Sequence, residues 1–273
     1  MTITFWDYMG LGRPQWRGES SLAKSLFFLV LGSPDTHARI RNAHVLNLIE
    51  ELPLPSQSEG LELGSARGLS LFWLARRHPQ WQLVGVDLEE EWVTISERAA
   101  RRGRYDNLTF RHGAAEDLEN KGKYDLILCI DALEHIQDDY GLLVKIREAL
   151  TPQGCLVIHV PRRRFDQWRW LRAFRDHTVD GHVGEEYQAE ELRQLMESAG
   201  LDIVTFRQTF GRWGEISFEL NMLAWRRWTL RNILALLTYP LAVPLGYMDV
   251  ARPPSWGNGF LVAARPAKSE ATP

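Results

Sequence analysis

The stretch LELGSARG at residues 61–68, followed by LVGVDLEEEW at residues 83–92, decides the fold of this chain. An apolar strand ends in a turn of small residues in the first, and an apolar strand ends in the acid Asp87 in the second. Gly64 and Gly68 tolerate backbone angles that other residues avoid, so backbone amides at the mouth of the next helix can approach a ligand closely. Asp87, at the carboxyl end of its strand, can accept both hydrogens of a ribose diol. Together the two segments predict a site for a nucleoside-bearing cofactor.

The spacing of the small residues argues against a dinucleotide. A G-x-G-x-x-G fingerprint that starts at Gly64 requires glycine at position 66 and glycine or alanine at position 69, where this chain has Ala66 and Leu69. The acid-x-G-x-G-x-G motif of the class I S-adenosylmethionine-dependent methyltransferases fits better, with alanine in place of its middle glycine. Its places are occupied by Glu62, Gly64, Ala66 and Gly68. The chain therefore resembles this family, and the resemblance implies S-adenosyl-L-methionine as the cofactor.

Three later segments match the same family in the same order. HGAAEDL at 112–118 resembles the segment that binds the adenine amino group, and YDLILCIDALEHI at 124–136 resembles the strand that delivers a D-x-L-E-H motif beside the methyl donor. LTPQG at 150–154 precedes the next strand, as is common in the family. The resemblance covers residues 59–161 and, more loosely, 186–265. It implies that the cofactor contacts Glu62, Gly64, Ser65, Ala66, Gly68, Asp87, Leu88, Ala115, Glu116, Ile130 and Asp131.

Histidines are the candidates for a catalytic base. The methyl group of a sulfonium is already activated, so the protein has to orient the acceptor, exclude water and take a proton where the acceptor is a hydroxyl. His135 is the first candidate because it follows the strand beside the methyl donor, and His182 in DGHVGEEYQAEEL is the second. Packing of His135 at a helix start is the alternative. His159 lies inside a strand and is expected to be a hydrogen-bonded core residue.

A metal ion is the other open question at the D-x-L-E-H motif. The small-molecule methyltransferases that carry this motif include the quinone-biosynthesis O-methyltransferases. Similarity to them leaves open a divalent cation held by Asp131, Glu134 and His135. We expect no metal at this site, because this set of ligands suits magnesium poorly.

Apolar runs and helical periods alternate along the chain as in βαβ units. Strands are expected at 60–64, 82–87, 108–112, 124–130, 154–160, 201–209 and 259–265, and helices at 21–31, 36–51, 69–78, 90–102, 139–150 and 189–199. The pattern predicts an α/β fold with a seven-stranded, mostly parallel, Rossmann-like sheet and helices on both faces. N-terminal helices precede the sheet, and a helical insertion precedes its last strand. The family resemblance implies that this last strand is antiparallel.

The chain is expected to divide into an N-terminal helical cap at 1–57, a methyltransferase domain at 58–265 and a disordered tail at 266–273. Within the domain, 162–186 is expected to form a substrate loop rich in arginine and aromatic residues, which suits an acidic acceptor or a solvated amphipathic helix. The apolar insertion at 216–250 is expected to be broken by Pro240 and Pro244 and is therefore a poor transmembrane span. A lid, a homodimer surface and a peripheral membrane anchor remain open for it.

Composition fits one soluble domain with a few added segments, since the 273 residues are 45% apolar and carry a net charge of −3. Basic residues gather at 98–104, 162–175 and 225–231. No second basic domain accompanies them, so no nucleic-acid partner is expected. Cys129 and Cys155 lie in apolar runs and are expected to be buried hydrophobes. The first apolar run is too short for a signal peptide, which predicts a cytoplasmic location, peripheral to the membrane if the apolar insertion is an anchor.

The sequence thus predicts S-adenosylmethionine-dependent methyl transfer to a small or amphipathic, lipid-like acceptor, at oxygen. Two alternatives share the cofactor site. One is a non-catalytic S-adenosylmethionine-binding protein. The other is an aminopropyl-type transferase on the same fold, against which the absence of a clear paired-acid polyamine site in the sequence counts.

Overall fold

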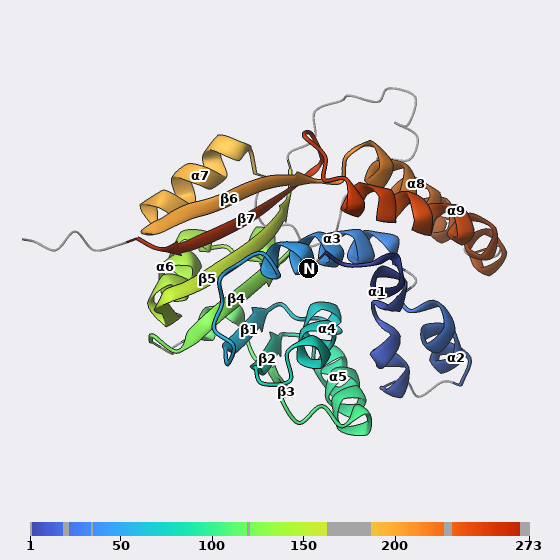
Figure 1. Ribbon diagram of the computed structural model, residues 1–273, viewed down its shortest axis with the longest axis horizontal. Helices are drawn as coiled ribbons and strands as arrows, with labels where there is room; N and C mark the ends of the chain where they lie inside the picture. The colour runs from blue at the N-terminus through green and yellow to red at the C-terminus, as the bar shows by residue number, and fades with distance from the viewer. Residues whose placement is uncertain are drawn as a thin grey trace, which may run out of the picture.

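A seven-stranded sheet forms the centre of the computed structural model, with its strands in the order β3-β2-β1-β4-β5-β7-β6 (Figure 1). The structure describes residues 2–18, 22–33, 35–118, 121–162, 187–226 and 231–267. The strands are β1 (Glu59–Leu63), β2 (Gln82–Asp87), β3 (Leu108–His112), β4 (Tyr124–Ile130), β5 (Leu150–Pro161), β6 (Leu201–Thr209) and β7 (Gly259–Pro266). The fold class predicted from the sequence is confirmed.

Strands β1 to β5 are joined by parallel ladders, and β7 runs antiparallel to both of its neighbours, β5 and β6. The antiparallel last strand that the family resemblance implied is therefore present. β4 and β5 are buried along most of their length, as expected for central strands covered on both faces. Because β1, β2, β4 and β5 are parallel, their carboxyl ends meet at one edge, which is where a ligand binds in this class of sheet.

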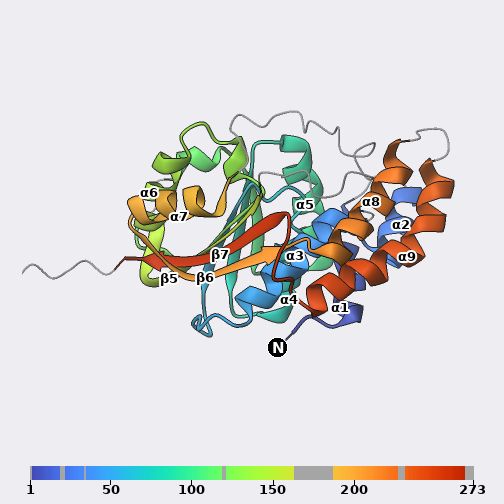
Figure 2. The same ribbon diagram turned by 90° about the horizontal axis from the view of Figure 1, so that it is seen from above.

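Helices cover both faces of the sheet (Figure 2). They are α1 (Phe5–Gly10), α2 (Leu22–Leu31), α3 (Thr36–Ile49), α4 (Leu69–Arg77), α5 (Glu90–Gly103), α6 (Asp139–Ala149), α7 (Ala189–Ser198), α8 (Arg212–Arg226) and α9 (Arg231–Ala251), with short 3₁₀ turns η1 (Arg13–Arg17), η2 (Ala115–Asp117) and η3 (Leu133–His135). Side chains of α3, α4 and α5 share one apolar cluster with the sheet, and those of α6 and α7 share the other. Helix α3 begins at residue 36, as the sequence predicts. Asp35 caps it by accepting a hydrogen bond from Ala38 N at 3.1 Å.

Two elements differ from the sequence-based expectation. β5 begins at Leu150 rather than at 154, because Leu150 already pairs with Tyr124 of β4. The apolar insertion forms two helices, and α9 continues through Pro240 and Pro244, which were expected to break it. Each proline removes one backbone hydrogen bond from the helix. Packing of α9 against α8 along the helical hairpin offsets that loss, as tertiary contacts commonly do.

No helix in the described part of the chain is both long and apolar enough to cross a membrane. Cys129 and Cys155 are buried free thiols, as predicted. Most of the expected substrate loop, residues 163–186, and the tail beyond residue 267 lie outside the described residues. The division of the chain at residue 57 stays a prediction.

Arg39 joins the N-terminal helices to the C-terminal pair. Its side chain is fully buried, and its guanidinium donates to Ser33 O at 2.6 Å, to Tyr8 O at 2.7 Å and to the hydroxyl of Tyr239. These groups belong to the loop before α3, to α1 and to α9. Segments distant in sequence therefore meet on one cation, at the end of the molecule where Figures 1 and 2 show α1, α2, α8 and α9 together.

Arg39→Met should lower the free energy of unfolding by roughly 2–4 kcal/mol, because several buried oxygens lose their donor while packing is largely kept. Urea unfolding followed by circular dichroism measures the change. Arg101→Met is the control, since Arg101 is 75% exposed and 4.0 Å from Glu97, and its loss should change stability by less than about 0.5 kcal/mol. Equal effects of the two substitutions would contradict the conclusion that Arg39 holds the N-terminal helices and the C-terminal pair together.

Candidate functional site

The turn between β1 and α4 has the backbone that its glycines predict. Gly64, Ala66 and Gly68 all have positive φ, at 67°, 43° and 66°. A Cβ atom on Gly64 would come within 2.8 Å of Ala132 Cβ, and one on Gly68 within 2.5 Å of the Phe110 ring. Both positions therefore need glycine for conformation and for space. The turn brings its backbone close to the end of β4 and opens α4 at the carboxyl edge of the sheet.

Asp87 ties this turn to the end of β2. One carboxylate oxygen accepts a hydrogen bond from Ala66 N at 2.6 Å, and the other accepts from Glu89 N at 2.9 Å. An ionised carboxylate has about four lone-pair sites, so these two bonds leave capacity for further donors. The arrangement suits a ribose diol bound between the turn and β2. Leu88, the next predicted contact, is 62% exposed.

Several buried polar atoms around the turn have no hydrogen-bond partner among the described residues. They are Glu62 Oε2, Ser65 Oγ and Glu116 Oε2. Unpaired buried polar atoms are uncommon and call for an explanation. A polar ligand held by the turn explains all three, so the residues present fit the cofactor that the sequence predicts. Ala115 and Ile130, the remaining small and apolar predicted contacts, are buried.

Glu62 is buried at the end of β1, directly before the turn. Burial raises the pKa of its carboxyl group from the ordinary value of 4.5 to about 8, although Arg41 acts in the opposite direction. A neutral Glu62 can donate a hydrogen bond as well as accept one. The acid of the motif therefore changes its charge near physiological pH when no ligand is bound.

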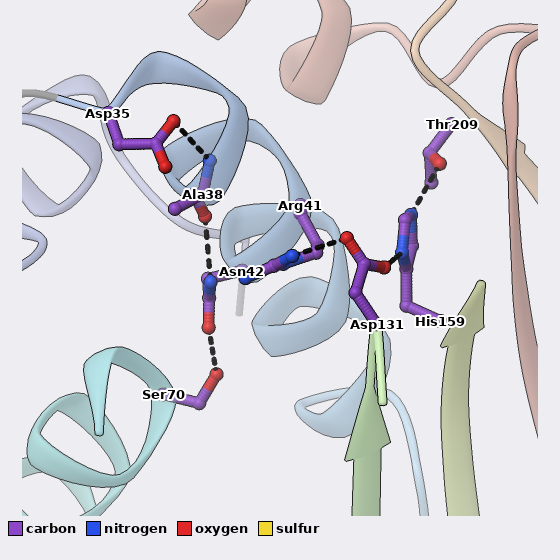
Figure 3. A network of polar contacts seen from close by, with 8 residues as sticks. All are labelled: Asp35, Ala38, Arg41, Asn42, Ser70, Asp131, His159 and Thr209. Carbon is purple, nitrogen blue, oxygen red and sulfur yellow. Dashed lines mark hydrogen bonds and ion pairs between the residues drawn. The ribbon is translucent and has the colours of Figure 1, made fainter. Parts of the chain in front are cut away.

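Asp131, predicted to flank the cofactor, is the centre of a polar network that sequence reasoning did not foresee (Figure 3). One of its carboxylate oxygens pairs with Arg41 Nη1 and the other with His159 Nδ1, while His159 Nε2 lies 2.8 Å from Thr209 Oγ1. The backbone of Asp131 has a positive φ of 45°, which is rare for a residue with a side chain. The network joins α3 to the carboxyl ends of β4, β5 and β6.

Charge explains how the network holds together. Burial alone would raise the pKa of Asp131, but the guanidinium of Arg41 and the imidazole of His159 outweigh it and hold that pKa well below its usual range. Because Asp131 is ionised, we assign the Nδ1 proton of His159 to the bond with Asp131, and His159 Nε2 shares the other hydrogen bond with the Thr209 hydroxyl. His159 is only 1% exposed, and both of its ring nitrogens are engaged, as expected for a core histidine.

Arg41 is the functional candidate that the sequence analysis missed. It uses Nη1 for Asp131, while its Nε is buried without a partner in the described part of the chain. The guanidinium carries five N–H donors and its side chain is 21% exposed, so it retains donors for a carboxylate. No pattern within α3 marks it, because its position follows from α3 lying over the carboxyl edge of the sheet. Figure 3 shows a second anchor of α3, in which Asn42 meets Ser70 of α4.

The two predicted catalytic histidines have different outcomes. His135 ends η3 and is exposed, and its catalytic role stays a prediction. His182 lies outside the described residues, whereas Tyr187, from the same predicted loop, donates a hydrogen bond to Asp139 at 2.8 Å. Within the described ranges, no three acidic, histidine or cysteine side chains lie close enough to hold a metal ion.

Comparison with known proteins agrees with these features. A family model described as a methyltransferase domain matches residues 37–205. Trans-aconitate 2-methyltransferase from Pseudomonas paraeruginosa (strain DSM 24068 / PA7) is 30% identical over 165 residues, which cover 59% of this chain and 56% of that protein. Ubiquinone biosynthesis O-methyltransferase from Acinetobacter baumannii (strain ACICU) is 24% identical over 128 residues, or 44% and 53% of the two chains. The chain spans about half the length of these curated relatives.

Solved structures support the fold. The crystal structure of the [4+2]-cyclase SpnF superposes with a TM-score of 0.61 at 19% identity, over 85% of this chain and 82% of that one. At this level of identity the similarity concerns the fold alone, and a shared fold does not fix a reaction.

Glu62→Gln should stabilise the protein at alkaline pH when no ligand is added. The raised pKa of Glu62 in the folded state provides stability that is fully present below about pH 4.5 and is lost as the pH rises through about 8. Glutamine cannot ionise, so the melting temperature of the variant should exceed that of the wild type by a few degrees near pH 8.5 and approach it near pH 5. Glu97→Gln, at an exposed position, is the control. If the difference in melting temperature between Glu62→Gln and the wild type does not change with pH, Glu62 is not a buried neutral acid in the folded protein.

Proposed function

The chain belongs to the S-adenosylmethionine-dependent methyltransferases, and from that premise we propose that it transfers the methyl group of S-adenosylmethionine to a hydroxyl oxygen of a small or amphipathic acceptor. The observation that carries the proposal is the joint geometry of the glycine turn and Asp87, together with the buried polar atoms of Glu62, Ser65 and Glu116 that have no partner among the described residues. When bound, the cofactor supplies a methyl group already activated by a positively charged sulfur. The protein then has to orient, desolvate and deprotonate the acceptor.

The residues that would hold the cofactor follow from their chemistry. Asp87 is placed to accept from the ribose hydroxyls, and Glu116 Oε2 is an unused acceptor for the adenine amino group. The unused donors of Arg41 suit the cofactor's carboxylate, and the buried carboxyl group of Glu62 suits its ammonium group. Asp131 would lie at the boundary between cofactor and acceptor, fixed there by Arg41 and His159.

Two observations favour an oxygen acceptor with a flat or apolar body. Both curated relatives carry methyltransferase names, and one name specifies O-methylation in ubiquinone biosynthesis. Beside Asp131, the aromatic rings of His37, Phe210 and Phe218 pack together, with His37 stacked on Phe210 at 4.4 Å between centroids. Such a wall suits the face of an unsaturated or aromatic acceptor.

Isothermal titration with S-adenosylhomocysteine tests the cofactor site. Asp87→Ala should weaken binding by roughly 10- to 100-fold, the effect of removing hydrogen bonds to a charged group. Glu97→Gln should leave affinity unchanged. Circular dichroism checks that each variant folds. Unchanged affinity in Asp87→Ala would show that the ribose is held elsewhere.

Transfer of a labelled methyl group tests the reaction itself. The protein, labelled S-adenosylmethionine and an extract of the source organism should yield a labelled small molecule, identified by mass spectrometry. A labelled methyl ether supports the proposal, whereas a labelled methyl ester would show that the acceptor is a carboxylate and not a hydroxyl. Label on nitrogen or carbon would refute the oxygen acceptor, and tight cofactor binding with no product from any extract would favour a non-catalytic binding protein.

A further inference from the structure

His37 differs from the other histidines that the structure describes. It lies in the first turn of α3, four residues before Arg41, so the two side chains share one face of the helix. Its ring is partly buried, stacked on Phe210 with an interplanar angle of 21° and tilted against Phe218 at 5.1 Å. Within the described part of the chain, neither ring nitrogen of His37 has a hydrogen-bond partner. The ring is therefore oriented by stacking while its nitrogens stay available.

The remaining described histidines are engaged or exposed. His44 contacts Asp249, His78 contacts Glu50, His112 contacts Leu88 O, and His159 contacts Asp131 and Thr209. His135 is exposed. Among the six histidines that the structure describes, His37 is thus the one that combines an oriented ring with an open nitrogen beside the Asp131 network.

A series of contacts that begins and ends on α3 connects His37 to Asp131, beside the proposed acceptor site. Its stacking partner Phe210 meets His159 edge to face at 6.0 Å, His159 bonds to Asp131, and Asp131 pairs with Arg41 on the same face of α3 as His37. Phe210 and Asp131 both have positive φ, at 57° and 45°. Non-glycine residues with such backbone angles are strained and persist only where the surrounding contacts hold them in place. They cluster at functional sites.

Burial favours the neutral form of His37, and the charges around it act in both directions. Burial lowers the pKa of its imidazole from 6.5 to about 4, and Arg41 and His159 act in the same direction. Asp131 and Asp35 oppose them, and α8, which also packs on α3, carries the acids Glu215 and Glu219. A neutral imidazole has a free lone pair on one nitrogen. The nearby carboxylate of Asp131 would stabilise the positive charge that a proton brings.

We propose that His37 is the catalytic base, which takes the proton of the acceptor hydroxyl. The inference rests on the proposed function, since only a hydroxyl acceptor has this proton to lose. As the acceptor oxygen forms its bond to the methyl carbon, its O–H bond breaks and the proton moves to the open nitrogen of His37. The methyl–sulfur bond breaks with its electron pair staying on sulfur, which leaves a neutral thioether. Asp131, held by Arg41 and His159, faces the imidazolium that results.

The test compares His37→Gln with His135→Gln, the same substitution at the histidine that sequence reasoning favoured. Glutamine keeps a polar side chain but cannot take a proton at neutral pH. With catechol as the probe acceptor, kcat of His37→Gln should fall at least about 100-fold, the usual contribution of a general base. His135→Gln should stay within threefold, and calorimetry should give both variants the wild-type affinity for S-adenosylhomocysteine. A kcat for His37→Gln within threefold of the wild type overturns the inference.

A second measurement needs no turnover. Nitrogen-15 NMR of the wild-type complex with S-adenosylhomocysteine, with His37 assigned by its loss in His37→Gln, reports the protonation state of its ring. A neutral ring at pH 7 supports the base, and a protonated ring overturns it whatever the acceptor. If catechol is not methylated by the wild type although His37 is neutral, the choice of an aromatic hydroxyl acceptor in the proposed function fails, and the kcat of His37→Gln is then compared with that of the wild type on the acceptor identified by labelled methyl transfer, with the same two outcomes.

Discussion

The pairing of Asp131 with Arg41 and His159 is the interaction on which the architecture of the site depends. Asp131 directly follows β4, Arg41 comes from α3, and His159 comes from β5 and contacts Thr209 at the end of β6. A buried carboxylate without partners would cost several kcal/mol, so the network holds α3 across the carboxyl edge of the sheet. Once α3 lies there, Arg41 pairs with Asp131, and His37, one turn earlier, stacks on Phe210.

The sequence predicted the sheet well because its signals are local. Strands β2, β3, β4 and β6 have the predicted bounds, since each is an apolar run closed by turn residues. The sequence misjudged α9, where proline propensity predicts a break but packing against α8 decides the outcome. It also gave no sign that Arg39 would join helices from both ends of the chain, because that contact depends on tertiary structure alone.

The candidate site likewise has one part that a local motif predicts and another that only the folded structure reveals. The glycine turn and Asp87 are read from a motif because their function requires particular backbone angles and one acid at a fixed place. His37 and Arg41 carry no such mark, since they precede β1 and meet the site only after the chain folds. Its place just after the strand beside the methyl donor favoured His135, the histidine of the D-x-L-E-H motif, and the structure places that residue in an exposed 3₁₀ turn. The donor side of the site was therefore predictable, and the acceptor side needed the structure.

The most direct test of the central claim is a crystal structure of the protein with S-adenosylhomocysteine bound. The account predicts that the ribose hydroxyls lie within hydrogen-bond distance of the Asp87 carboxylate, with the sulfur beside Asp131 and the His37 ring open to the space in front of it. Electron density for the ligand away from the turn of Gly64 to Gly68, or a ribose that does not contact Asp87, would contradict it.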